Sequence, residues 1–135
     1  MKVKDIMSHQ VLTLHPKEKI KNAYDLCNLH RIHHLPITVH NKVVGILSYG
    51  DLLFARDINS KLQIISREEI HALGFDLVES IMKRNPITIG QEAEVRDAVD
   101  LMVKYRINCL PVVDDGELVG IFTSFDVMRY VQQQA

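Results

Sequence analysis

The chain has 135 residues, of which 47% are hydrophobic and 24% are charged, a balance that excludes a largely disordered chain. Its 16 Lys and Arg residues stand against 17 Asp and Glu residues, so the formal net charge of −1 gives no electrostatic case for binding nucleic acid or an anionic membrane. The sequence shows neither an apolar run of about 20 residues that would span a bilayer nor the apolar core of a secretory signal, so we expect a cytoplasmic protein.

The first half of the chain predicts a small unit that alternates strands and helices. Apolar residues recur at three- and four-residue spacing from Ile20 to Cys27, which indicates a helix. Pro16 suits the first turn of this helix, because the N–H that proline lacks is unpaired there in any case. Asn41 is typical of the turn of a hairpin. In chain order, the expected elements are an opening turn over Val3–Met7, a strand over Val11–Leu14, this helix, strands over Leu35–Val39 and Val43–Ser48, and a helix near Gly50–Ala55.

A linker over Arg56–Leu77 separates this unit from a second one with the same order of elements. Within the linker, residues 66–69 (Ser-Arg-Glu-Glu) have the pattern of a capping box and Gly74 that of a helix stop, so we expect a short connecting helix. In the second unit, apolar residues recur with helical spacing from Val95 to Tyr105. The other expected elements are an opening turn over Val78–Met82, a strand over Ile87–Ile89, strands over Leu110–Val113 and Leu118–Thr123 joined by a turn at Asp114–Gly116, and a helix over Phe125–Val131.

The two units are copies of one sequence. When the sequence is shifted by 75 positions, Val3–Phe54 aligns with Val78–Arg129 without a gap, and 15 of the 52 aligned residues are identical. A match of this length indicates a duplication, which divides the chain into a first repeat (1–55), the linker (56–77) and a second repeat (78–135). One repeat alone would bury too little apolar surface to be stable. We therefore expect an α+β protein whose two repeats pack sheet against sheet about a pseudo-two-fold axis.

The most informative residues lie where the last strand of each repeat ends. A hydroxyl residue is followed three positions later by an aspartate, as Ser48 and Asp51 in the first repeat and as Thr123 and Asp126 in the second. At the start of a helix this is the pattern of a capping box, in which both side chains pair with backbone N–H groups. The first interpretation of the pattern is therefore purely structural.

The second interpretation is a nucleotide site that uses the same geometry. The N-terminus of a helix attracts phosphate, to which the hydroxyl of Ser48 or Thr123 would add a hydrogen bond. The carboxylate of Asp51 or Asp126 can accept hydrogen bonds from both hydroxyls of a ribose. A glycine in the preceding strand would allow a flat base to approach the backbone. Because the pattern recurs in two diverged copies, we favour this interpretation; the alternative is a ligand-free dimerisation or interaction module.

Together these features resemble the CBS domain, and the whole chain resembles a stand-alone pair of CBS domains. The resemblance rests on the Ile-Met pair that opens each repeat, the strands at Thr13 and Thr88, the segments His33–Ile37 and Asn108–Val112 with their shared Leu-Pro, and the two strand ends that run from glycine to aspartate. It implies a small sheet flanked by helices in each repeat, two ligand clefts between the repeats, and a homodimer of two pairs. It also implies an adenosine-containing ligand, with AMP, ADP or ATP expected ahead of S-adenosylmethionine or NAD.

The resemblance also implies a role for each candidate site residue. Grouped by role, these residues are Asp51 and Asp126 for the ribose, Ser48 and Thr123 for the phosphate, Thr13 and Thr88 for the adenine, and His33, His34 and Asn108 for further phosphate contacts. We expect two unequal clefts, because His33 and His34 align with Asn108 and Cys109, which carry no positive charge. A phosphate contact that needs the charge of these histidines would weaken above about pH 6.5.

Other functions find less support in the sequence. Several histidines lie between residues 30 and 40, but His33 and His34 would point to opposite faces of a strand, so we expect no metal site. No nucleophile motif, glycine-rich phosphate loop or dinucleotide fingerprint occurs, so we expect no enzymatic activity and no catalytic residue. Cys27 and Cys109 lack metal or redox spacing and are expected to be reduced thiols in or near the core. Any ligand signal would then pass to an unidentified effector protein.

Overall fold

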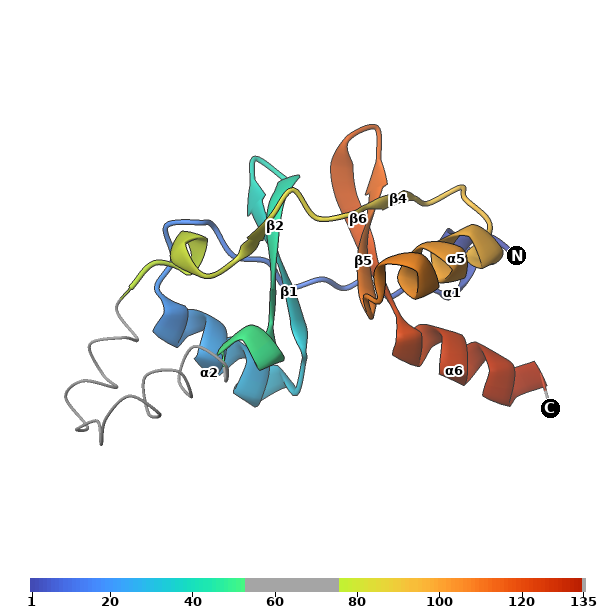
Figure 1. The fold of residues 1–135 in the computed structure, drawn as a ribbon, viewed down its shortest axis with the longest axis horizontal. Coiled ribbons are helices and arrows are strands. Elements are labelled where there is room, and N and C mark those ends of the chain that lie inside the picture. Colours follow the sequence, from blue (N-terminus) through green and yellow to red (C-terminus); the bar gives the residue numbers. More distant parts are fainter. Residues whose placement is uncertain (53–75, 135) are drawn as a thin grey trace. The chain divides into compact units, whose positions relative to one another are not determined.

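The computed structural model describes residues 1–52 and 76–134 and divides the chain into two compact units. We call them the first-repeat unit, made of Leu12–His40 and Val44–Asn85, and the second-repeat unit, made of Met1–Val11, Asn41–Val43 and Pro86–Ala135. Both contain helices and a small sheet, so the predicted α+β class is confirmed (Figure 1). The connecting helix predicted within residues 66–74 lies outside the described residues.

The sheet of the first-repeat unit has the strand order β1-β2-β3. Helix α2 (Ile20–His30) precedes β1 (His34–Val39) and β2 (Lys42–Ser48). The 3₁₀ helix η1 (Val78–Ser80) precedes β3 (Lys83–Arg84), a strand that the sequence did not predict and that pairs antiparallel with β2. The buried core of this unit comprises Ala23, Cys27, Leu35, Ile37, Leu47, Leu52, Val78 and Met82.

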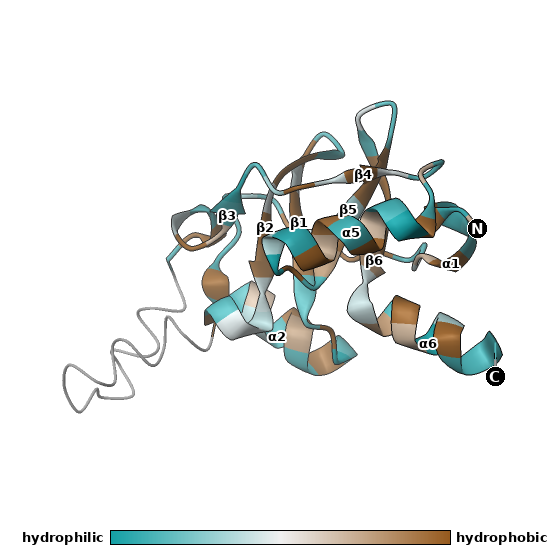
Figure 2. Cartoon of the chain, turned by 45° about the vertical axis from the view of Figure 1, so that its right-hand side comes forward, coloured by the Kyte–Doolittle hydropathy of each residue, from teal (hydrophilic) through white to brown (hydrophobic). Residues whose placement is uncertain are grey.

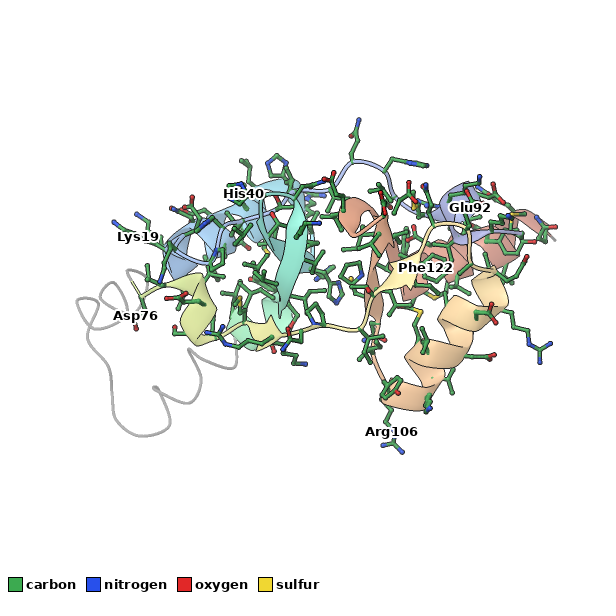
Figure 3. The ribbon with its side chains drawn as sticks, turned by 90° about the horizontal axis from the view of Figure 1, so that it is seen from above. Lys19, His40, Asp76, Glu92, Arg106 and Phe122 are labelled. Carbon is green, nitrogen blue, oxygen red and sulfur yellow. The ribbon has the colours of Figure 1, made fainter. Side chains whose placement is uncertain are left out.

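The sheet of the second-repeat unit has the order β4-β5-β6, with a parallel pair followed by an antiparallel pair. In chain order its elements are α1 (Val3–Ile6), β4 (Ile89–Gly90), α5 (Val95–Tyr105), β5 (Cys109–Asp114), β6 (Glu117–Thr123) and α6 (Ser124–Gln134). Phe122 of β6 is fully buried in the core of this unit, whereas Arg106, just after α5, is exposed at its end (Figure 3).

Both hairpins turn through two consecutive residues with positive φ. These are His40 (50°) and Asn41 (63°) in the first hairpin, and Asp115 (52°) and Gly116 (82°) in the second. Two positive φ values match the right-handed twist of the flanking strands, and Asn, Asp and Gly adopt them at the lowest cost. The turns predicted at Asn41 and Asp114–Gly116 are therefore confirmed.

The segment before α2 differs from the prediction. The helix begins at Ile20, so Pro16 lies in the preceding turn, and its predicted place in the first turn of the helix is wrong. Residues 16–18 form a turn and a bend, Lys19 forms an isolated bridge to Leu77, and the Glu18 carbonyl accepts a hydrogen bond from the Val78 N–H (2.7 Å). This pairing with a residue 60 positions away is not visible in local sequence.

The first strand of each repeat is shorter than predicted. In place of a strand over Val11–Leu14, only Leu14 forms an isolated parallel bridge, to Ile37. In the second repeat the strand begins at Ile89 and pairs with β5 through Ile89 opposite Val112. The first strand of each repeat therefore pairs with its parallel neighbour at only one or two positions.

Each sheet also includes the opening segment of the other repeat. Ser8 of the first repeat pairs with Ile121 of β6 through two backbone hydrogen bonds of 2.9 Å. In the same way, Arg84 of the second repeat lies opposite Gly45 of β2. The openings are thus exchanged between the repeats, and the spatial units differ from the repeats of the sequence by this exchange.

The exchange explains the glycine in the last strand of each repeat. A Cβ atom on Gly120 would lie 2.6 Å from Met7 Sδ and 2.9 Å from the Ser8 carbonyl oxygen. A Cβ atom on Gly45 would lie 2.5 Å from Met82 Sδ. All three distances are well below van der Waals contact, so each glycine makes room for the methionine that opens the other repeat. The approach of a flat base, predicted as the reason for the glycine, stays a prediction, and the space on the Cβ side of each glycine is taken by methionine.

Candidate functional site

The motif of the first repeat lies at the junction of β2 and a helical turn. β2 ends at Ser48, and the helical turn begins at Tyr49. The Ser48 N–H donates to Asp51 Oδ2 (3.0 Å), and the Asp51 N–H donates to Ser48 Oγ (2.9 Å). This reciprocal pair is a capping box, so the structural interpretation of the motif is confirmed. It also holds both side chains at the positive end of a helix, where an anion is favoured.

The motif of the second repeat has the same arrangement at the start of α6. The Thr123 N–H donates to Asp126 Oδ2 (2.9 Å), and the Asp126 N–H donates to Thr123 Oγ1 (3.4 Å). The Thr123 hydroxyl in turn donates to Asp126 Oδ2 (3.3 Å). Duplication has therefore preserved the local geometry as well as the residue types.

The two aspartates nevertheless differ in their surroundings. Asp126 is only 2% exposed, and its Oδ1 accepts hydrogen bonds from Ser8 Oγ (3.3 Å) and Arg129 Nη2 (2.8 Å). Asp51 is partly exposed, and within residues 1–52 and 76–134 its Oδ1 has no hydrogen bond or ion pair. The two aspartates therefore differ in exposure and in hydrogen bonding. This difference comes from Ser8 and Arg129, and it adds to the predicted contrast between the histidines and Asn108.

The residues before each Leu-Pro pair lie beside the motif of their own repeat. The His33 carbonyl accepts a hydrogen bond from the Tyr49 N–H (2.8 Å), and the Asn108 carbonyl accepts one from the Ser124 N–H (3.0 Å). The side chain of His33 is exposed, that of His34 is half-buried, and that of Asn108 is exposed. The structure therefore brings His33 close to the start of the helical turn that carries Asp51.

Thr13 and Thr88 lie beside the first strand pairing of their own repeats. Thr13 is exposed and precedes Leu14, whose backbone pairs with β1. Thr88 is half-buried and immediately precedes β4. Across the described part of the chain, neither side chain has a hydrogen bond to a motif residue. Their role near an adenine stays a prediction.

Comparison with known proteins gives the family. The sequence matches the CBS domain over residues 3–57 and again over residues 78–133. The chain belongs to the CBS domain family. Its fold is that of a CBS pair, two tandem units of this type, and the similarity stated from the sequence motifs is confirmed.

Relatives of this CBS pair include parts of larger enzymes. It is 36% identical to an inosine-5'-monophosphate dehydrogenase of Korarchaeum cryptofilum and 37% identical to an L-aspartate semialdehyde sulfurtransferase of Methanocaldococcus jannaschii, over 87% and 94% of this chain. The chain spans only about a fifth of the length of these two relatives, 21% and 22%. A CBS domain-containing protein of Dictyostelium discoideum is 32% identical over 93% of this chain and 88% of its own length.

Two similar solved structures contain adenosine compounds. The CBS domain pair of protein MJ0100, in complex with 5'-methylthioadenosine and S-adenosyl-L-methionine, has a TM-score of 0.84 and 34% identity, covering 100% of this chain and 98% of that one. CBSX2 in complex with AMP has a TM-score of 0.81 and 28% identity, covering 98% and 97%.

Aromatic and basic residues beside the first CBS motif were not among the predicted site residues. Tyr49 stacks on Tyr24 with ring centroids 5.9 Å apart, and His33 meets Tyr49 edge-on at 6.3 Å. Lys83 of β3 is exposed and lies opposite Ile46, two residues before Ser48. Tyr24 and Tyr49 could have been noticed as aromatic residues near the motif, whereas Lys83 reaches it only through the exchanged opening segment.

The charge state of His34 is set mainly by burial. Burial lowers the pKa of the His34 imidazole below its ordinary value of 6.5, and the neighbouring His33 and Lys83 lower this pKa further, while Asp51 opposes them. In the ligand-free protein the neutral form of His34 is therefore favoured near pH 7. The loss of affinity above about pH 6.5 stays a prediction.

The lowered pKa of His34 makes the stability of the CBS pair depend on pH. The unfolded chain binds the proton more tightly, so the contribution of neutral His34 is complete above about pH 6.5 and is lost as the pH falls below it. We expect the urea midpoint to fall less between pH 7.5 and 5.5 in a His34→Gln variant than in the wild type. A His9→Gln variant, changed at an exposed histidine, is the control and should follow the wild type. If the urea midpoint fell equally with pH in His34→Gln and in the wild type, the assignment of this pH dependence to His34 would be wrong.

Both thiols of the CBS pair are buried. Cys27 and Cys109 are both free and buried, as predicted, and burial raises the pKa of the Cys109 thiol to about 12, with a smaller contribution from Asp126. Within the described residues, no group of three or more His, Cys, Asp or Glu side chains is placed to hold a metal ion. No described helix is long and apolar enough to cross a membrane.

Proposed function

We propose that this CBS pair is a regulatory module, without enzymatic activity of its own, that binds an adenosine nucleotide through Ser48 and Asp51. The observation that carries the proposal is the state of Asp51: its Oδ2 is held by the Ser48 N–H, while its Oδ1 is unpaired in the described residues and the side chain is partly exposed. A carboxylate oxygen in this state can accept the hydroxyls of a ribose. The helix N-terminus beside it suits the phosphate.

The nature of the ligand is supported by similar structures. AMP is bound by CBSX2, and 5'-methylthioadenosine and S-adenosyl-L-methionine are bound by the CBS pair of MJ0100. All three contain adenosine, so the shared chemistry is the nucleoside. We place AMP first, followed by ADP and ATP, because exposed His33 and Lys83 near the motif offer donors for a phosphate. S-adenosylmethionine and NAD come after these.

A homodimer is the proposed assembly, and an unidentified effector protein is the proposed recipient of the signal. Helix α6 exposes three apolar side chains at three-residue spacing, with Phe125, Met128 and Val131 each about 60% exposed. Hydrophobic residues, coloured brown, recur along α6 in Figure 2. Side chains of this size are favoured in the buried centre of an interface. The same observation supports the second candidate function, a ligand-free dimerisation module, in which the two capping boxes serve only to start helices.

A thermal-shift panel separates the two candidates. AMP, ADP, ATP, S-adenosylmethionine and NAD are tested, with UMP as a control that has the same ribose and phosphate but a different base. At about 100 times its Kd, a ligand adds roughly 2.7 kcal/mol to the free energy of unfolding, which raises Tm by several degrees. We expect AMP to give the largest rise and UMP a smaller one. The absence of a rise with every adenosine compound would favour the ligand-free module.

A further inference from the structure

The carboxylate of Asp126 has no acceptor site to spare. An ionised carboxylate offers about four lone-pair positions. On Asp126 Oδ2, two are taken by the N–H and the hydroxyl of Thr123 (2.9 and 3.3 Å). On Oδ1, the other two are taken by Ser8 Oγ (3.3 Å) and Arg129 Nη2 (2.8 Å). With 2% of its surface exposed, Asp126 can accept the hydroxyls of a ribose only after Ser8 or Arg129 has left.

The corresponding residues of the first repeat differ in type. In the alignment of the repeats, Lys83 stands where the second motif has Ser8, and Phe54 stands where it has Arg129. Lys83 occupies the same place in the sheet as Ser8, since Lys83 lies opposite Ile46 and Ser8 opposite Ile121. In the described residues, however, Lys83 makes no hydrogen bond or ion pair to Asp51. The difference between the motifs therefore comes from Ser8 and Arg129.

We propose that Ser8 and Arg129 close the second motif to ribose and thereby limit this CBS pair to one adenosine nucleotide per chain, bound at Asp51. Arg129 is the stronger partner, because its hydrogen bond is charge-assisted and its guanidinium neutralises a buried carboxylate. Phe125 lies 5.7 Å below the guanidinium and helps to hold it there. Arg129 and Ser8 are thus positioning residues that decide which motif is open. This inference rests on the proposed function.

Calorimetric titration of the full chain with AMP tests the inference through the number of ligands bound. We expect one AMP per chain for the wild type. In a Ser8→Ala/Arg129→Met double variant, we expect a second AMP to bind, with an affinity at least tenfold higher than any second binding to the wild type. Arg129→Lys keeps a cation at the position and is the matched control, for which one AMP per chain is expected. Two equivalents in the wild type, or one in a folded double variant, would overturn the inference.

A second pair of variants gives a result even if the double variant does not fold. Asp51→Asn should weaken AMP binding at least tenfold, whereas Asp126→Asn should change the Kd less than threefold while lowering Tm. Both substitutions keep an oxygen that can accept the capping hydrogen bond from the backbone N–H. The comparison therefore reports the effect of losing the carboxylate charge and one acceptor oxygen at each position. Equal weakening by the two variants would overturn the closed state of the second motif but leave the proposed function in place. No AMP binding to the wild type would overturn both.

Discussion

Replacing Gly120 with alanine should lower the free energy of unfolding by about 2–3 kcal/mol, a fall in Tm of roughly 6–12 °C. The new Cβ would lie 2.6 Å from Met7 Sδ and 2.9 Å from the Ser8 carbonyl oxygen. The sulfur can move, but the carbonyl is held by its hydrogen bond from the Ile121 N–H (2.9 Å). The strand or the opening segment must therefore shift. Thermal or urea unfolding followed by circular dichroism measures the change.

Alanine substitutions at two further glycines provide a scale for the loss of stability in Gly120→Ala. Gly45→Ala should cost about 1–2 kcal/mol, because the closest contact is the side chain of Met82, with its backbone neighbour Lys83 O farther away at 3.1 Å. Gly90→Ala is the matched control, since nothing lies within 4 Å of its new Cβ, and it should change stability by less than about 0.5 kcal/mol. A Gly120→Ala variant as stable as Gly90→Ala would contradict the exchanged packing of Met7 on β6.

Replacing Asp51 with asparagine should weaken AMP binding at least tenfold. Hydrogen bonds to a charged group contribute about 1.5–3 kcal/mol, which corresponds to roughly 10- to 150-fold in affinity. The asparagine side chain keeps an oxygen for the Ser48 N–H, so the cap and the fold should persist. Calorimetric titration gives the affinity, and the unfolding midpoint reports on the fold.

The control for Asp51→Asn is Asp25→Asn, which removes the same charge from an exposed position on α2 of the same repeat. Its affinity for AMP should match that of the wild type. If Asp51→Asn bound AMP as tightly as Asp25→Asn, the carboxylate would have no part in the site. The assignment of the ribose to Asp51 would then be wrong.

The elements with the strongest local signals were predicted closely. Helix α5 and strands β5 and β6 begin and end within one residue of the predicted ranges or spacing, because apolar periodicity and turn residues mark their limits. The hairpin turns at Asn41 and Asp115–Gly116 were predicted for the same reason. In these segments, local propensity and tertiary packing favour the same structure.

The features that were missed depend on contacts between distant parts of the chain. β3, Lys83–Arg84, consists of two charged residues and forms only because β2 lies beside it. The hydrogen bond from Ser8 to Asp126 joins residues 118 positions apart. No local pattern marks either one. Arg129, by contrast, follows Asp126 by one helical turn, a spacing at which an ion pair could have been predicted from the sequence.

The candidate site was predicted in part for the same reason. The Ser48/Asp51 and Thr123/Asp126 pairs are local motifs, and both form the capping geometry that their spacing indicates. The surroundings of Asp126 depend in part on Ser8, which the exchanged opening segment places beside it and which a local motif does not show. The sequence therefore predicted two motifs of the same type in unequal surroundings, and the structure shows that Asp126 is buried and hydrogen-bonded to Ser8 and Arg129.

The central claim, that this CBS pair binds an adenosine nucleotide at Asp51, is tested most directly by equilibrium dialysis with radiolabelled AMP. The wild type and Asp51→Asn are measured side by side, with unlabelled adenosine and UMP as competitors. We predict saturable binding to the wild type that adenosine displaces more strongly than UMP, and at least tenfold weaker binding to Asp51→Asn. Absence of saturable binding to the folded wild type, or equal binding to both proteins, would contradict the claim.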